Sequence, residues 1–161
     1  MTLQMKSFAD IEIVEMAYRN ISAVAALERE CFSVPWSENA LVEELGNAQA
    51  HFLCAEAQSG TVGYIGVQEI AGEAYITNVA VTEKARRQGI AERLLEEAEN
   101  GAAERGCEFI TLEVRMSNEP AKALYRKRGF KSMGIRKNYY TAPSEDAEIM
   151  TKFFGCEGGV K

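Results

Sequence analysis

The sequence is poor in residues that build metal sites and disulfide frameworks. It has one histidine, three prolines and four cysteines among 161 residues, and the cysteines are Cys31, Cys54, Cys107 and Cys156. No two cysteines have CxxC spacing, which excludes a zinc knuckle and a thioredoxin-like motif, so we interpret them as reduced packing residues. The histidine, His51, opens an expected strand, which argues against a histidine-based triad. The sequence therefore predicts no metal site.

Long apolar runs and an excess of positive charge are also missing. The first ten residues, MTLQMKSFAD, lack the apolar region of a signal peptide, and no apolar run approaches the ~20 residues of a membrane span. The net charge of −6, from 24 acidic and 18 basic residues, argues against nucleic-acid binding and is compatible with a cationic substrate. We expect a cytosolic monomer without membrane contact.

Apolar periodicity predicts a single domain over residues 1–161, because no repeat or linker interrupts it. Seven strands are expected at 11–17, 51–57, 62–70, 74–81, 107–114, 130–140 and 147–154. Four helices are expected: 20–32, 37–46, one from about Ile90 to Gly106, and a short one between Pro120 and Gly129.

The links between these elements predict how the strands pair. Short turns join 51–57 to 62–70 and 62–70 to 74–81, so these strands should be antiparallel. A helix joins 74–81 to 107–114, so these two should be parallel neighbours. The expected fold class is α/β of the mixed α+β kind, with a mostly antiparallel sheet and helices on its faces.

The stretch VAVTEKARRQGIAERLL carries the main functional signal. It places Arg86-Arg87-Gln88-Gly89-Ile90-Ala91 in a turn that opens a helix after a buried strand. A helix N-terminus attracts anions, and a glycine there lets a phosphate approach the backbone. The alternative interpretation is an ordinary helix start with a solvated basic turn.

Two other phosphate-binding motifs fit this stretch less well. No Lys-Ser/Thr pair follows Gly89, so it is not a P-loop. A Rossmann site would use Glu113, about 20 residues further on, as its ribose ligand. However, only one of the three glycines of that fingerprint is present, and a hairpin meander precedes the loop.

Two motifs together carry a family resemblance. The pattern RRQGIA (86–91) after NVAV resembles the acetyl-CoA loop of the GNAT acetyltransferases, and LEVRMSNEPAKALYRKRGF (112–130) resembles their next strand and helix. The element order agrees from about 11 to 154. Within the superfamily the chain is most similar to the RimI type, the ribosomal-protein alanine N-acetyltransferases, through FSVPWSENAL, LEVRMSN, ALYRKRGF and RKNYY. Ala91 stands where that family often has glycine.

The resemblance implies a cofactor site for acetyl-CoA, with no metal. The amides of Val79, Ala80 and Val81 would hold the pantetheine and the thioester. The loop and first helical turn would hold the pyrophosphate, mainly through backbone groups. Its residues are Arg86, Arg87, Gln88, Gly89, Ile90, Ala91 and Glu92, and Asn118 would also contact the coenzyme.

The resemblance also assigns two catalytic residues and an acceptor groove. Glu113 matches the proton acceptor, and a glutamate in an apolar setting is a stronger base. Tyr125 matches the proton donor to the leaving thiolate. From the residues alone, Glu113 could face solvent and Tyr125 could be a core residue. The groove would be lined by Pro35, Trp36, Tyr139 and Tyr140, although Trp36 and Tyr140 fit a core or rim role equally well.

The expected function is transfer of an acetyl group to the N-terminal amine of a protein. The resemblance indicates the N-terminal alanine of a small-subunit ribosomal protein as the acceptor. A lysine, a polyamine or another small amine is the alternative within enzymes. A non-catalytic acyl-CoA sensor is the alternative from another class, and the presence of both Glu113 and Tyr125 disfavours it.

Overall fold

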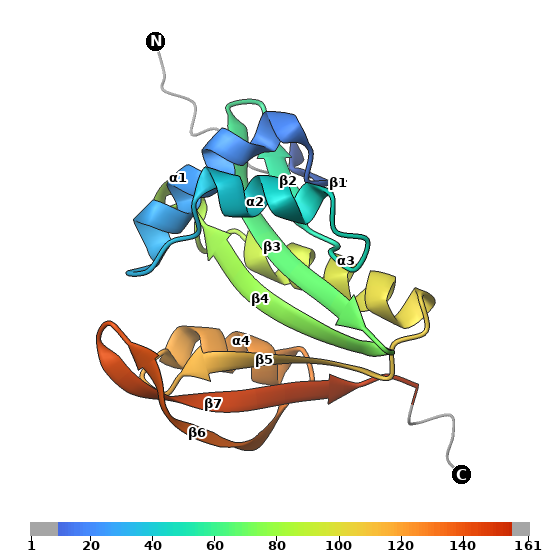
Figure 1. Cartoon of the computed structure of the whole chain (residues 1–161), viewed down its shortest axis with the longest axis vertical. Helices are drawn as coiled ribbons and strands as arrows, with labels where there is room; N and C mark the ends of the chain where they lie inside the picture. Colours follow the sequence, from blue (N-terminus) through green and yellow to red (C-terminus); the bar gives the residue numbers. More distant parts are fainter. Residues whose placement is uncertain (1–9, 156–161) are drawn as a thin grey trace.

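A computed structural model of the protein describes residues 10–155. Seven strands form one sheet in the order β1-β2-β3-β4-β5-β7-β6 (Figure 1). The strands are β1 (Glu12–Glu15), β2 (Leu53–Ala57), β3 (Gly60–Ile70), β4 (Glu73–Val81), β5 (Phe109–Arg115), β6 (Lys131–Thr141) and β7 (Ser144–Phe153). The α-helices are α1 (Ile21–Cys31), α2 (Glu38–Leu45), α3 (Ile90–Glu104) and α4 (Glu119–Lys127), with 3₁₀ turns at Tyr18–Asn20 and Glu83–Ala85.

Helices cover both faces of the sheet because the strands alternate apolar side chains between two cores. One core joins α1 and α2 to Phe52, Cys54 and Tyr64. The larger core joins α3 and α4 to the opposite face, where Ile65 and Leu112 are buried. The sheet is thus the middle of three layers, and α1 and α2 lie in front of it in Figure 1.

Strands β4 and β5 run parallel but separate after a short contact. They pair at Glu73–Phe109, Ala74–Ile110 and Tyr75–Thr111 only. Beyond these pairs β4 continues along β3 as far as Val81, and β5 continues along β7 as far as Arg115. The carboxyl halves of the two strands therefore spread apart, as Figure 1 shows, and leave an opening in the middle of the sheet.

A bulge bends β4 inside this opening. Gly66 of β3 pairs with Asn78 and Val67 pairs with Ile76, so Thr77 is an extra residue on β4. A Cβ atom added at Gly66 would lie 2.4 Å from Thr77 Oγ1 and 2.8 Å from the ring of Phe52. Only glycine allows the bulge and the ring to approach β3 this closely.

Ion pairs connect the two halves of the sheet on the side of α3. Glu99 of α3 is almost completely buried and accepts hydrogen bonds from Arg128 at 2.9 Å and from Lys152 at 2.7 Å. Glu92, in the first turn of the same helix, pairs with Lys127 at 3.0 Å. These contacts attach α3 to the end of α4 and to β7, across the region where β4 and β5 have separated.

The structure confirms the expected fold class, the element order and the parallel pairing of the strands at 74–81 and 107–114. Helix α2 begins as expected, because Ser37 Oγ accepts a hydrogen bond from the Ala40 amide at 3.1 Å. The first strand is shorter than 11–17, and β7 begins at Ser144 rather than at 147. Both 3₁₀ turns were unexpected. Cys156 lies outside the described residues, within which no helix is long and apolar enough to cross a membrane.

We predict that Gly66→Ala destabilises the fold. The added methyl group meets a β-branched side chain and a core ring, and overpacking of this kind lowers the free energy of unfolding by about 1–3 kcal/mol. Gly46→Ala is the matched control, since its Cβ meets nothing closer than the Glu43 carbonyl at 3.8 Å. Urea unfolding of both variants measures the difference, and equal stabilities would contradict the role of Gly66 in the bulge.

Candidate active site

Helix α3 begins without a side-chain cap. Gly89 is its N-cap residue and has the left-handed φ of 79°, and no side chain within residues 10–155 caps the first turn. Arg87, two residues earlier, also has a positive φ of 64°. The first amide groups of the helix can therefore donate hydrogen bonds to a ligand. The partial positive charge of the helix N-terminus favours a ligand that is an anion.

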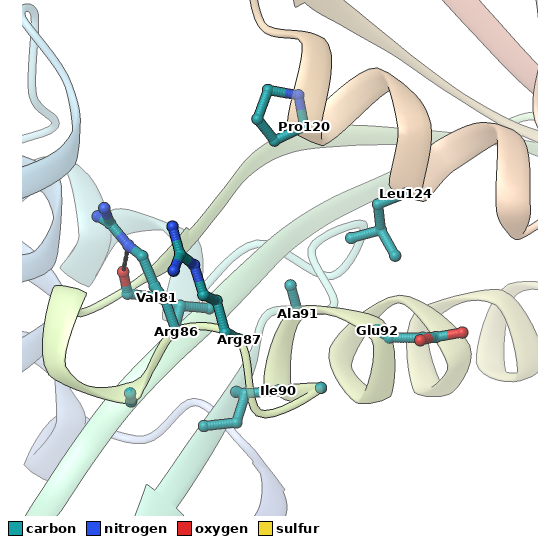
Figure 2. Close-up of a pocket in the computed structure, with 10 residues that line it drawn as sticks. Val81, Arg86, Arg87, Ile90, Ala91, Glu92, Pro120 and Leu124 are labelled. Carbon is teal, nitrogen blue, oxygen red and sulfur yellow. Dashed lines mark hydrogen bonds between the residues drawn. The ribbon is translucent and has the colours of Figure 1, made fainter.

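A cavity of about 300 Å³ opens at this helix start. Arg86, Arg87, Gly89, Ile90, Ala91 and Glu92 form one wall, and Pro120 and Leu124 of α4 form the facing wall. Figure 2 shows Leu124 directed from α4 towards α3 across the space above Ala91. The cavity therefore combines amide donors with an apolar wall, which fits a ligand with a phosphate group and an aliphatic arm.

The two arginines of the loop have different surroundings. Arg86 Nε donates to the Val81 carbonyl at 2.8 Å, drawn as a dashed line in Figure 2, and its guanidinium lies 3.8 Å from Glu30 of α1. Arg87 is exposed and has no hydrogen bond or ion pair within residues 10–155. Arg86 thus attaches the loop to β4 and α1, and Arg87 is the side chain free to meet an anion.

Val79, Ala80 and Val81 lie on the part of β4 that has left β5. They pair with Ile65, Tyr64 and Gly63 of β3 on one edge. On the other edge, none of the described strands pairs with β4 beyond Tyr75, so alternate residues present main-chain N–H and C=O groups to the opening. These groups can bind an extended ligand as a missing strand would.

Glu113 lies on β5 at the opposite side of the opening. Its neighbours Leu112 and Val114 face the core under α3 and α4, so Glu113 points to the other face of the sheet. Its carboxylate, about a quarter exposed, pairs with Arg136 Nε at 3.0 Å. Its carbonyl accepts a hydrogen bond from Tyr140 Oη at 3.1 Å. The surroundings are therefore charged and polar, and the expectation of an apolar setting was wrong.

Tyr125 of α4 is buried on the face opposite to Glu113. Its ring packs against Phe130 with 5.7 Å between centroids, and burial is the main reason that the pKa of its hydroxyl rises to about 12. The hydroxyl has no hydrogen-bond partner within residues 10–155. It therefore remains protonated at neutral pH. Asn118, at the start of the same helix, accepts from the Ala121 amide at 3.3 Å as the N-cap.

Of the four expected groove residues, Pro35 and Trp36 lie on the loop between α1 and α2, and Tyr139 and Tyr140 lie near the end of β6. Pro35 is exposed, whereas Trp36 is half-buried with its ring 5.9 Å from that of Phe52. Tyr139 and Tyr140 lie on β6 with their rings edge to face. Ser33 Oγ donates to the Ala142 carbonyl, so the loop between α1 and α2 contacts the turn between β6 and β7.

Sequence reasoning missed two residues that organise this region. Arg115, at the end of β5, donates to the carbonyls of Pro143 and Ala142 at 2.9 and 3.2 Å and lies 4.2 Å above the Tyr140 ring. Glu28 is a fully buried carboxylate on α1. The available signal for Glu28 was its place on the apolar face of the helix expected at 20–32, where a charge requires partners.

Comparison with known proteins identifies the family. The model of the acetyltransferase (GNAT) family matches residues 21–130. The chain belongs to the GNAT acetyltransferase family. A Bacillus subtilis (strain 168) protein provisionally named as a [ribosomal protein bS18]-alanine N-acetyltransferase is 39% identical over 84% of this chain and 90% of its own length. The Escherichia coli (strain K12) enzyme with that name is 35% identical, over 81% of this chain and 89% of its own.

Solved structures of GNAT proteins agree with the fold. The crystal structure of the ribosomal-protein-S18-alanine N-acetyltransferase from Escherichia coli has a TM-score of 0.83 at 30% identity, covering 91% of this chain and 95% of that one. Arabidopsis thaliana NAA60 in complex with acetyl-CoA has the same score at 15% identity, covering 91% and 99%, and shares the fold.

Membership of the GNAT family confirms that the chain is an enzyme, an acetyl-CoA-dependent N-acetyltransferase. The Rossmann and sensor interpretations were therefore wrong. The residues present fit the coenzyme: the uncapped start of α3 suits its phosphates, and the open edge of β4 suits its pantetheine arm. When bound, acetyl-CoA supplies the activated acetyl group as a thioester.

We predict that Gly89→Ala weakens acetyl-CoA binding about tenfold, or ~1.4 kcal/mol. The added methyl group meets no protein atom within 4 Å and projects into the open space at the start of α3, where we expect a phosphate of the coenzyme. Gly106→Ala at the other end of α3 is the matched control, because its φ of 92° is equally strained and its Cβ is equally unobstructed. Isothermal calorimetry distinguishes them: equal affinities in the two variants would show that only backbone strain matters.

Proposed function

We propose that the enzyme acetylates the N-terminal α-amine of a protein, specifically the N-terminal alanine of a ribosomal protein. The observation that carries this proposal is the similarity to enzymes named for that reaction, over more than four fifths of the chain. The polar, partly exposed setting of Glu113 and the contact between the α1–α2 loop and the β6–β7 turn support it. We also propose that residues 1–161 act as one domain, as a monomer in the cytoplasm.

The two proposed proton transfers take place on opposite faces of the sheet, beside the opening between β4 and β5. Glu113 accepts a proton from the acceptor nitrogen, which forms the new C–N bond to the acetyl carbon. Tyr125, on the face shared with α4, donates its proton to the sulfur as the C–S bond breaks. Amides at the open edge of β4 are the candidate donors to the carbonyl oxygen, where negative charge develops. No covalent enzyme intermediate is needed, because the amine is itself the nucleophile.

We predict that Glu113→Gln and Tyr125→Phe each lower kcat by about 10²–10⁴-fold, the usual contribution of a general base or acid. Both substitutions preserve shape, so calorimetry should find acetyl-CoA affinity almost unchanged. Tyr18→Phe is the control for loss of a phenol, since Tyr18 is 73% exposed. A Glu113→Gln enzyme that works at the wild-type rate across the pH range would remove Glu113 as the base.

An α-amine suits this site better than a lysine does. The reference pKa of an α-amine is ~7.7–8.0 and that of a lysine is ~10.4, so the α-amine is far more often unprotonated at neutral pH. Glu113, paired with Arg136, is the proposed base, and the easier deprotonation matches it. The net charge of −6 favours a basic acceptor peptide.

We predict that a peptide beginning with a free alanine, followed by basic residues that include lysine, is acetylated only on its α-amine. The control is the same peptide with a blocked N-terminus, which should remain unmodified. Tandem mass spectrometry after incubation with enzyme and acetyl-CoA locates the acetyl group. Label on lysine side chains alone would overturn the N-terminal assignment and favour a lysine or small-amine acceptor.

A further inference from the structure

Glu28 is a carboxylate without solvent contact, on the face of α1 that packs against the sheet. Its exposed fraction is 0%, and within residues 10–155 no basic side chain forms an ion pair with it. Three neutral donors surround it: the Trp36 amide at 2.9 Å, Tyr64 Oη at 2.5 Å and Asn78 Nδ2 at 2.8 Å. A buried carboxylate is tolerated only when its oxygens are satisfied in this way.

These donors come from three separate parts of the molecule. Trp36 belongs to the loop between α1 and α2, which contacts the β6–β7 turn through Ser33. Tyr64 belongs to β3, and Asn78 is the residue of β4 directly after the bulge. Glu28 therefore connects the loop at the acceptor side to the strand that borders the opening.

A second glutamate on α1 makes a parallel set of contacts to the cofactor loop. Glu30 accepts hydrogen bonds from Thr82 Oγ1 at 3.0 Å and from the Glu83 amide at 2.8 Å, and lies 3.8 Å from Arg86. Residues two apart on a helix point in different directions. Helix α1 thus presents Glu28 to the α1–α2 loop and Glu30 to the loop between β4 and α3.

We propose that Glu28 is a positioning residue that fixes the α1–α2 loop for binding of the acceptor, whereas Glu30 performs this task for the acetyl-CoA loop. The role of the loop in acceptor binding rests on the proposed function. The geometry requires a carboxylate: Oε1 accepts from Trp36, and Oε2 accepts from Tyr64 and Asn78. A glutamine has one acceptor oxygen, so its NH₂ group must face at least one of these donors.

The test compares Glu28→Gln with Glu30→Gln as a matched pair on one helix. For Glu28→Gln we expect KM for the alanine peptide to rise about tenfold, the usual result of losing a buried hydrogen bond, with acetyl-CoA affinity within twofold of wild type. For Glu30→Gln we expect the reverse pattern. Trp36 is the only tryptophan, so its fluorescence reports the loop directly. Emission should shift to longer wavelength, with stronger acrylamide quenching, in Glu28→Gln alone.

Wild-type peptide KM and Trp36 emission in a folded Glu28→Gln enzyme would overturn the proposal, as would equal losses of peptide and acetyl-CoA binding. If Glu28→Gln does not fold, Tyr64→Phe decides, because it removes one donor and keeps the bond from Trp36. Tyr64→Phe should raise KM for the peptide by less than tenfold and leave the affinity for acetyl-CoA unchanged. An unchanged KM counts against the proposal. If the wild-type enzyme leaves the peptide unmodified, the proposed function fails, and Trp36 emission still decides the role of Glu28.

Discussion

The separation of β4 from β5 after three residue pairs determines where every part of the site lies. Both strands end at the wide side of the opening, so the loop after β4 and the loop after β5 both emerge there. Each loop leads into a helix, and the starts of α3 and α4 consequently flank the same space. The carboxyl half of β4 keeps backbone donors that a complete parallel sheet would use. Buried Glu99, with Arg128 and Lys152, attaches the two halves where the sheet does not.

Charge is distributed so that an acidic protein can bind an anionic coenzyme. Near the start of α3, Glu92 is paired with Lys127, and Glu30 is close to Arg86. The negative charges of these two acidic side chains at the cavity are therefore largely neutralised. What remains there is the helix N-terminus and Arg87, which has no ion pair among residues 10–155. On the other face, Glu113 retains partial exposure beside a single arginine. The start of α3 is thus positive and the face around Glu113 carries a carboxylate, as expected for an anionic acetyl donor and a cationic acceptor.

Local signals were sufficient for most elements and for the start of α3. Ser37 and Gly46 mark the two ends of α2, and Pro120 and Gly129 mark those of α4. Gly89 marks the start of α3. These ends are predictable because caps and breakers act through neighbouring residues. The bulge at Thr77 had no local signal, since it depends on the approach of Phe52 to Gly66. The partners of Arg86 and Glu113 were also unpredictable, because Glu30 and Arg136 approach them only after the chain has folded. Periodicity assigned Glu113 to a strand without determining which face it occupies.

Helix α1 has a wider role than its pattern of apolar residues indicates. Its buried face carries Glu28, bonded to the α1–α2 loop and to β4 beside the bulge, and Glu30 reaches the turn that precedes α3. The α1–α2 loop in turn contacts the β6–β7 turn, which Arg115 holds from the end of β5. A displacement of α1 would therefore disturb the loops on both sides of the opening. Because one helix bears both glutamates, the α1–α2 loop and the loop between β4 and α3 have a fixed relative position, and a direct transfer between two bound substrates requires such a constraint.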